Sequence, residues 1–162
     1  MAYPYPAKMR ATRDLLRRRN YMVRQCGLLV SHIKNTNTQY NLPLFEKNIS
    51  RKFNHDGVAE RFDDPSVRAA VEADLAMIEA FNNLIKPLEW QIEKIACQHD
   101  HNSLYLLRTI PGVGQILALV ILYEVQDIKR FSKVQRFCSY ARLIRPGWTS
   151  KSPGQYLLTS PD

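Results

Sequence analysis

Residues 8–34 repeat apolar side chains at heptad spacing, with polar residues between them. One row recurs every seven residues and a second row lies beside it, and these are Met9, Leu16, Val23 and Val30, then Leu15, Met22 and Leu29. Ile33 extends the stripe, and no proline interrupts the segment. The pattern predicts one long helix with an apolar seam of the coiled-coil type.

Residues 66–99 show the same spacing. Val71, Ile78, Ile85 and Ile92 recur every seven residues, and Phe81, Leu88 and Ile95 supply the second row. Asp64 followed by Pro65 is a typical helix start, a cap and then a first-turn proline. Pro87 falls inside the pattern, so we expect it to kink this second helix or split it in two.

The segment between these helices, residues 35–65, is rich in asparagine and contains Pro43 and Gly57. It reads as a connector with one short helix near residues 45–53. Two long helices joined in this way favour an antiparallel hairpin. A two-helix hairpin cannot hide all of its apolar surface, so the seam is also suited to pairing with a second copy of the chain.

Residues 103–141 read as a compact helical unit. Ser103 is placed to cap the segment "LYLLRTI", which is followed by "PGVG", an apolar helix over residues 115–124, a turn at "DIKRF" and an amphipathic helix capped by Ser132. From Arg145 onward, three prolines and two glycines predict an irregular tail. The fold class is therefore all-α, with a helical hairpin over residues 1–102, a small bundle over 103–144 and a tail over 145–162.

The "PGVG" segment carries the candidate chemistry. The pattern Leu107, Ile110, Gly112, Val113, Gly114, Ala118 and Ile121 fits a helix-hairpin-helix. Glycines allow a tight turn and leave its surface bare, and the next helix starts there with free N–H groups that favour an anion. Candidate nucleic-acid-binding residues are Gly112, Val113, Gly114 and Gln115, with Arg108, Lys129, Arg130 and Lys133 nearby. The alternative is a turn between two core helices that meets no phosphate.

Charge is distributed unevenly along the chain, whose formal net charge is +8. Residues 1–35 carry eight Lys or Arg against one acid, residues 60–100 carry four against nine, and residues 101–162 carry eight against three. Basic regions of this kind favour a polyphosphate partner, although a solvated helix face is equally compatible with them. In a hairpin, the basic first helix would lie along the acidic second helix and neutralise much of this charge.

Other classes of protein and site find little support in the sequence. No segment resembles a transmembrane helix or a secretory signal, so we expect a cytoplasmic setting without a membrane partner. Three widely spaced cysteines, Cys26, Cys97 and Cys138, suggest reduced, half-buried core residues. Cys97, His99 and His101 lie two residues apart, but zinc sites need four ligands and no second pair is evident, so no metal site is predicted.

Five segments in continuous order resemble one family. They are "MRATRDLLRRRNYMVRQ", "NTNTQYNLP", "DGVAERFDDPSV", "LYLLRTIPGVGQILALVILYEVQDIKRF" and "VQRFCSYARLI". Together they resemble the DEDD-type, bridge-RNA-guided insertion-sequence transposases, the one-ten family. The resemblance runs from about Tyr5 to about Ile144. It implies an RNase-H-like domain with a divalent metal such as magnesium, then a coiled coil for multimer assembly, then a transposase domain that begins at "PGVG" and carries a catalytic serine.

Under this resemblance the chain is expected to be truncated at both ends, because it starts where the coiled coil starts and no residue corresponds to the four carboxylates. No cofactor is then expected in this chain. Ser152 falls at the position of the serine, but the expected bases after it are absent and the tail looks degenerate, so we expect little catalysis by this chain alone.

The implied partners are DNA, a guide RNA and other copies of the family, as a homo-oligomer or as a hetero-oligomer with full-length transposase. The first hypothesis is therefore a truncated transposase that retains DNA-backbone binding and multimerisation. Two alternatives are a non-enzymatic, dimerising DNA-binding protein that modulates full-length transposase and an unstable product with no role.

Overall fold

The computed structural model describes residues 5–141, and the expected tail from residue 145, including Ser152, lies outside them. The chain forms two compact units, Met1–Gln126 and Asp127–Asp162. Within residues 5–141 the elements are helices, turns and loops without a strand, so the all-α prediction is confirmed. No helix in this range is long and apolar enough to span a bilayer.

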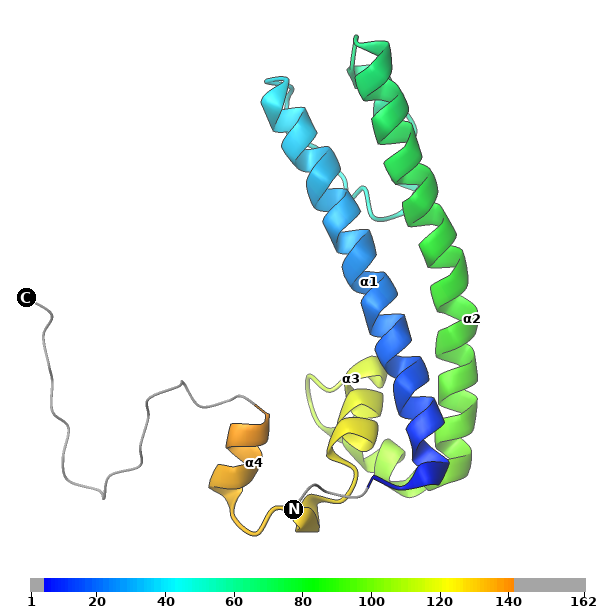
Figure 1. The fold of residues 1–162 in the computed structure, drawn as a ribbon, viewed down its shortest axis with the longest axis vertical. Helices are drawn as coiled ribbons and strands as arrows, with labels where there is room; N and C mark the ends of the chain where they lie inside the picture. The colour runs from blue at the N-terminus through cyan, green and yellow to red at the C-terminus, as the bar shows by residue number, and fades with distance from the viewer. Residues whose placement is uncertain (1–4, 142–162) are drawn as a thin grey trace, which may run out of the picture. The chain divides into compact units, whose positions relative to one another are not determined.

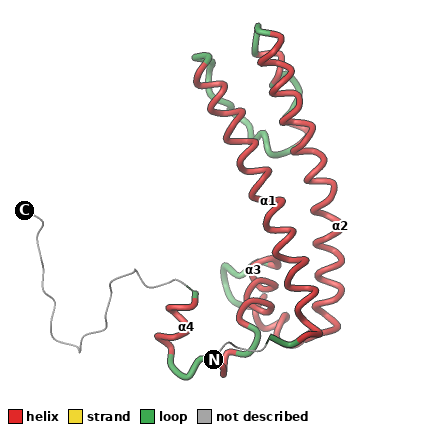
Figure 2. Tube along the Cα trace, viewed as in Figure 1, coloured by secondary structure: helices red, strands yellow, loops and turns green. Residues whose placement is uncertain are grey.

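Two long helices, α1 (Ala7–Gln39) and α2 (Pro65–Thr109), run antiparallel and side by side in the first unit (Figures 1 and 2). The predicted row on α2 is confirmed, since Val71, Ile78, Ile85 and Ile92 are all buried. On α1 the heptad row is wrong at Val23, which is 39% exposed. The buried α1 positions are spaced by four, six or seven residues and include polar members: Thr12, Leu16, Met22, Cys26, Ile33 and Asn37.

Polar contacts between charged or titratable side chains join the two long helices beside the apolar seam. Arg19 donates to Glu89 at 2.5 Å, and His32 Nδ1 lies 2.5 Å from Asp74 Oδ2. The Arg19 pair is mostly shielded from solvent, with side-chain exposures of 15% and 29%. The basic first helix therefore does lie along the acidic second helix, as the charge pattern predicts.

The second long helix begins as predicted. The Asp64 side chain accepts hydrogen bonds from the N–H groups of Ser66 and Val67, and Pro65 occupies the first turn. The expected split at Pro87 is wrong, because the backbone angles stay helical there. The helix breaks instead at Asp100, which has φ −160° and ψ 82°.

Asp100 also caps the segment that follows the break. Its carboxylate accepts a hydrogen bond from the Ser103 N–H at 2.9 Å, so the cap is Asp100 and the predicted Ser103 cap is wrong. Hydrogen bonds from the Ser103 side chain and backbone hold the pKa of Asp100 below its usual value.

The connector packs against the end of the helix pair where α1 stops and α2 starts. Ile49, Val58, Ala59 and Phe62 are buried there together with Ile33 of α1 and residues of α2. The helix expected near residues 45–53 is wrong, since the connector contains turns and two 3₁₀ turns, Lys52–Asn54 and Ala59–Arg61. The connector therefore covers apolar side chains of both long helices near the end where it joins them.

At the other end of the hairpin, α3 (Gln115–Val120) and a π-helical turn (Ile121–Val125) pack on both long helices. The shared core contains residues of α1, α2, α3 and the π-helical turn: Leu16, Ile92, Ala96, Leu104, Ala118, Leu119, Leu122 and Tyr123. Arg17 of α1 also binds both carboxylate oxygens of Glu124, at 2.6 and 2.7 Å. The segment 101–125 is thus fixed to the end of the stalk formed by α1 and α2.

The second unit contains a 3₁₀ turn (Ile128–Arg130) and α4 (Val134–Tyr140). Asp127 accepts a hydrogen bond from the Lys129 N–H and starts the turn. The predicted Ser132 cap is wrong, because the residue before α4 is Lys133 and no side chain caps the helix. The three cysteines are free, as predicted; Cys26 is buried and Cys138 is half-buried, whereas the prediction is wrong for Cys97, which is exposed.

Candidate nucleic-acid interface

The predicted glycine turn lies on the surface between the end of α2 and the start of α3. We call residues 110–114 the glycine corner. Pro111, Gly112 and Gly114 are exposed, while Val113 is half-buried and packs against the shared core. Ala118 and Leu119 lie immediately behind the corner and are fully buried. The corner is therefore a bare surface on a firmly packed base.

The two glycines have different roles. Gly112 has φ +84°, the left-handed region that side chains avoid, so the turn requires glycine at this position. Gly114 has φ −74° and ψ 173°, which any residue can adopt. A Cβ added at either position would meet nothing within 4 Å. Gly114 thus contributes an open surface rather than a special backbone angle.

The amide groups of the corner are only partly available. The Val113 N–H donates to the Ile110 carbonyl at 3.0 Å and closes the turn. The first bond of α3 runs from the Ala118 N–H to the Gly114 carbonyl at 2.9 Å. The N–H groups of residues 115–117 precede that first bond, and such groups at a helix start lack intrahelical acceptors. An anion would therefore meet the start of α3 rather than the Val113 amide.

One predicted cation lies beside the corner in the same unit. Arg108 is in the last turn of α2, is about half exposed, and donates from Nη1 to Glu93 at 3.4 Å. This long contact holds the guanidinium near the surface without burying it. Gln115, the other polar residue predicted here, is half-buried at the start of α3.

The remaining predicted cations belong to the second unit. Lys129 and Lys133 are exposed. Arg130 is half-buried, and its guanidinium carbon lies 4.6 Å from the Phe131 ring centre and 4.5 Å from the Tyr140 ring centre. Arg130 is thus held between aromatic rings, which is a packing role in addition to any contact with a ligand.

The structure also contains a buried polar network that the sequence does not reveal. Tyr123 is fully buried, and its hydroxyl lies 2.9 Å from His99 Nδ1 and hydrogen-bonds the Thr12 side chain. Its carbonyl accepts from the Tyr5 hydroxyl at 2.7 Å. Burial raises the pKa of Tyr123 to about 12. A tyrosine in an apolar run looks like an ordinary core residue, so only the fold shows that it joins α1, α2 and the π-helical turn.

Acidic and metal-type residues do not gather into a site within residues 5–141. Among them, no group of three His, Cys, Asp or Glu side chains could hold a metal ion. Asp64 caps α2, Asp74 pairs with His32, and Glu79 pairs with Lys52. Ser152 lies outside the described residues, and its assignment as the inherited serine position stays a prediction.

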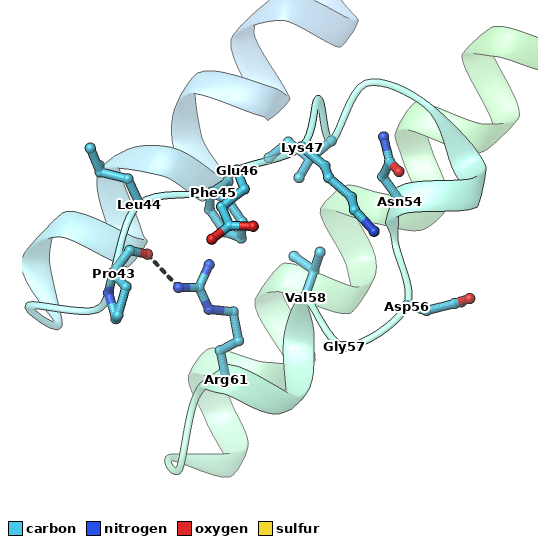
Figure 3. A pocket seen from close by; sticks show the side chains of 11 residues that line it. Pro43, Leu44, Phe45, Glu46, Lys47, Asn54, Asp56, Gly57, Val58 and Arg61 are labelled. Atoms are coloured by element: carbon cyan, nitrogen blue, oxygen red, sulfur yellow. Dashed lines mark hydrogen bonds between the residues drawn. The ribbon is translucent and has the colours of Figure 1, made fainter.

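The connector also contains a surface depression (Figure 3). It has a volume of about 300 Å³ and is lined by residues of the segment 43–61, including Phe45, Lys47 and Asp56. The Arg61 guanidinium crosses it, lying 4.4 Å from the Phe45 ring centre and donating to the Pro43 carbonyl. Its acids and bases offset each other, so it lacks the one-sided charge of an anion site.

Comparison with known proteins gives a family match for the segment that contains the glycine corner. Residues 104–147 match the family model described as "Transposase IS116/IS110/IS902 family". The match begins four residues after the break at Asp100 and includes the corner. No curated protein and no solved structure gives a significant match. The match covers about a quarter of the chain and supports a transposase-related function.

Proposed function

We propose that this chain provides the DNA-backbone-binding and assembly part of a transposase of this family, and that the glycine corner is the DNA contact of a helix-hairpin-helix. The observation that carries the proposal is the exposed corner on a buried base, inside the segment that matches the transposase model. A bare turn followed by a helix start suits a phosphate, and contacts of this kind position a duplex without reading its sequence.

Charge supports the same role. Arg108 lies beside the corner, and residues 101–162 carry eight Lys or Arg against three acids. Phosphate contacts make affinity fall as salt rises, because bound cations are released from the DNA. Binding of duplex DNA by this chain should therefore be strong at low salt and insensitive to sequence. In this proposal a guide RNA would use the same backbone chemistry.

A second feature supports assembly with another copy. The outer face of α2 has exposed apolar residues at steps of three and four, which are Ala70, Ala73, Met77, Ala80 and Leu84. Met77 is 44% exposed and Leu84 is 55% exposed. This stripe has the spacing of a coiled-coil seam and lies away from the seam that meets α1. We propose that it pairs with the same stripe of a second chain.

The same stripe favours the alternative function, a dimerising modulator that binds full-length transposase. Met77→Glu and Leu84→Glu should reduce the mass measured by light scattering to that of one chain. If the wild-type chain itself is monomeric at micromolar concentration, the assembly proposal and this alternative both fail. Co-purification with a full-length transposase, lost in the double variant, would favour the modulator.

The test of DNA binding is Gly114→Asp. The substitution places a carboxylate where the phosphate would approach, and the backbone angles and free space at this position accommodate a side chain. Duplex affinity, measured by fluorescence anisotropy at two salt concentrations, should fall by about tenfold, which corresponds to about 1.4 kcal/mol. The salt dependence should become shallower by about one phosphate contact.

Gly27→Asp is the matched control. Gly27 lies on the exposed side of α1, a Cβ there also meets nothing within 4 Å, and the change in net charge is identical. It should leave the affinity within about twofold of wild type. Equal affinities for the two variants would show that the corner does not touch DNA, provided that circular dichroism shows both to be folded.

A further inference from the structure

A pocket lies on the surface at the bend of α2, and its lining ends one residue before the glycine corner. Its volume is about 340 Å³, and it is lined by Cys97, His101, Leu104, Tyr105, Arg108 and Thr109. We call it the bend pocket. It exists because the break at Asp100 separates the stalk part of α2 from its last two turns. Its size is at the small end of ligand pockets, enough for one planar ring system.

Its lining combines an aromatic ring with polar and cationic groups. Tyr105 lines the pocket and is 63% exposed, so most of its surface is accessible to a ligand. His101 and Thr109 add hydrogen-bonding groups, and Arg108 adds a planar cation that stacks well on ring systems. A flat aromatic face with hydrogen-bonding groups around it is the chemistry that holds a nucleobase.

A second aromatic residue continues this surface along the stalk. Trp90 is 65% exposed and lies on the same face of α2 as Cys97, seven residues earlier, or about 10 Å away. Lys94 lies between them, with its ammonium 5.1 Å from the Trp90 ring centre. Rings and cations therefore recur along this surface: Trp90, Lys94, Tyr105 and Arg108, the last of which also contacts Glu93 at 3.4 Å. Such a surface suits a strand whose bases stack and whose phosphates need neutralisation.

The bend pocket is also continuous with the proposed DNA contact. Thr109 and Arg108 line the pocket, and the next residue of the chain opens the glycine corner. We propose that the bend pocket takes an unpaired nucleobase from the strand whose backbone is held at the glycine corner. This rests on the proposed function and adds that the ligand includes a single-stranded segment. Paired bases are excluded because they are already stacked inside the helix.

The test measures binding of labelled oligo(dT) to the full chain. Tyr105→Ala should weaken this binding by about 5- to 150-fold, the range of losing one stacked base. Tyr105→Phe keeps the ring and should bind within about twofold of wild type. Tyr21→Ala is the matched control, because Tyr21 is an exposed tyrosine on α1. An oligonucleotide of the same length with abasic sites keeps the phosphates but lacks the bases. The wild-type chain should bind it as weakly as Tyr105→Ala binds oligo(dT).

A second measurement reports on Trp90 directly. The chain has two tryptophans, so Trp148→Phe leaves Trp90 as the only one. Its fluorescence should be quenched by oligo(dT) and not by the abasic strand. The unpaired base could come from RNA or from DNA, and a comparison of oligo(U) with oligo(dT) distinguishes them. Tighter binding of oligo(U) would identify RNA as the ligand, and tighter binding of oligo(dT) would identify DNA.

The two proposals fail in different ways. If Gly114→Asp weakens duplex binding but Tyr105→Ala leaves oligo(dT) binding unchanged, the bend pocket holds no base and the corner stands. If neither variant changes binding of any strand, the corner fails and the bend pocket fails with it. Equal binding of oligo(dT) and the abasic strand by wild type also overturns the bend-pocket proposal.

Discussion

Replacing Tyr123 with phenylalanine tests the network that ties the glycine corner to the stalk. The substitution removes one oxygen from a fully buried site and leaves the ring, so it opens no sizeable cavity. His99 Nδ1, at 2.9 Å, and the Thr12 side chain both lose their partner. Thr12 is 4% exposed, so water does not readily replace the lost contact.

Two effects determine how much Tyr123→Phe changes the free energy of unfolding. At neutral pH, the loss of one or two buried neutral hydrogen bonds should lower the free energy of unfolding by about 1–2 kcal/mol. The second effect appears in alkali. Burial raises the pKa of Tyr123 to about 12, whereas an unfolded tyrosine titrates near 10. As the pH rises above about 10, the unfolded chain therefore releases this proton before the folded chain does.

Because the unfolded chain releases the proton first, rising pH lowers the free energy of unfolding through Tyr123. The contribution of Tyr123 to stability is complete below about pH 10 and declines as the pH approaches about 12, by about 1.4 kcal/mol per unit. The total loss is about 2.7 kcal/mol, which exceeds the neutral-pH benefit. The advantage of the wild type over Tyr123→Phe should therefore disappear near about pH 11. Other tyrosines and lysines titrate in both proteins and cancel in the difference.

Urea unfolding followed by far-ultraviolet circular dichroism measures the difference at each pH. The expected result is a wild-type advantage at neutral pH that shrinks steadily in alkali. A difference that stays constant from about pH 9 to about pH 11.5 would refute the reasoning, because the hydroxyl would then titrate alike in both states. Equal stability at neutral pH would show that the buried contacts contribute nothing net.

Two further predictions concern the corner and the thiols. Gly112→Ala should lower the free energy of unfolding by about 1–2 kcal/mol because of its positive φ, whereas Gly114→Ala should change it by less than about 0.5 kcal/mol; equal effects in urea titrations would contradict the assigned backbone angles. With iodoacetamide, exposed Cys97 should be alkylated first and Cys26 last, since burial raises the pKa of the Cys26 thiol. Mass spectrometry of quenched samples checks the order, and early modification of Cys26 in folded protein would count against its burial.

The long helices were predictable because their signal is long and periodic. Val71 and Ile92 lie three heptads apart and both are buried where the spacing puts them. The end of α1 was not predictable, because the segment "NTNTQ" disfavours helix. Its helix persists because the Asn37 amide, buried at the end of α1, donates to the Leu42 and Pro43 carbonyls. The Asn37 contacts depend on the connector, which local sequence does not specify.

The position of the break in α2 was also not predictable from local sequence. Proline is the strongest local breaker, yet Pro87 lies on the exposed side of the helix, where water can bond the carbonyl that it leaves without a donor. Asp100 carries a weaker local signal, but its cap and the burial of Leu104 favour a new helix direction there. The glycine corner itself was predictable, since positive φ selects glycine at position 112. The neighbouring bend pocket was not, because it depends on the break.

The bend at Asp100 separates a long helical segment from a short one, so a small change of backbone angle there would displace the far end of α2 by a large distance. From Pro65 to the bend the stalk part of α2 is roughly 50 Å long, so a rotation of about 10° at one residue would move the far tip by roughly 9 Å. The Tyr123–His99 hydrogen bond and the Arg17–Glu124 ion pair hold the segment after the bend against the two long helices. Such a rotation would therefore require these contacts to break.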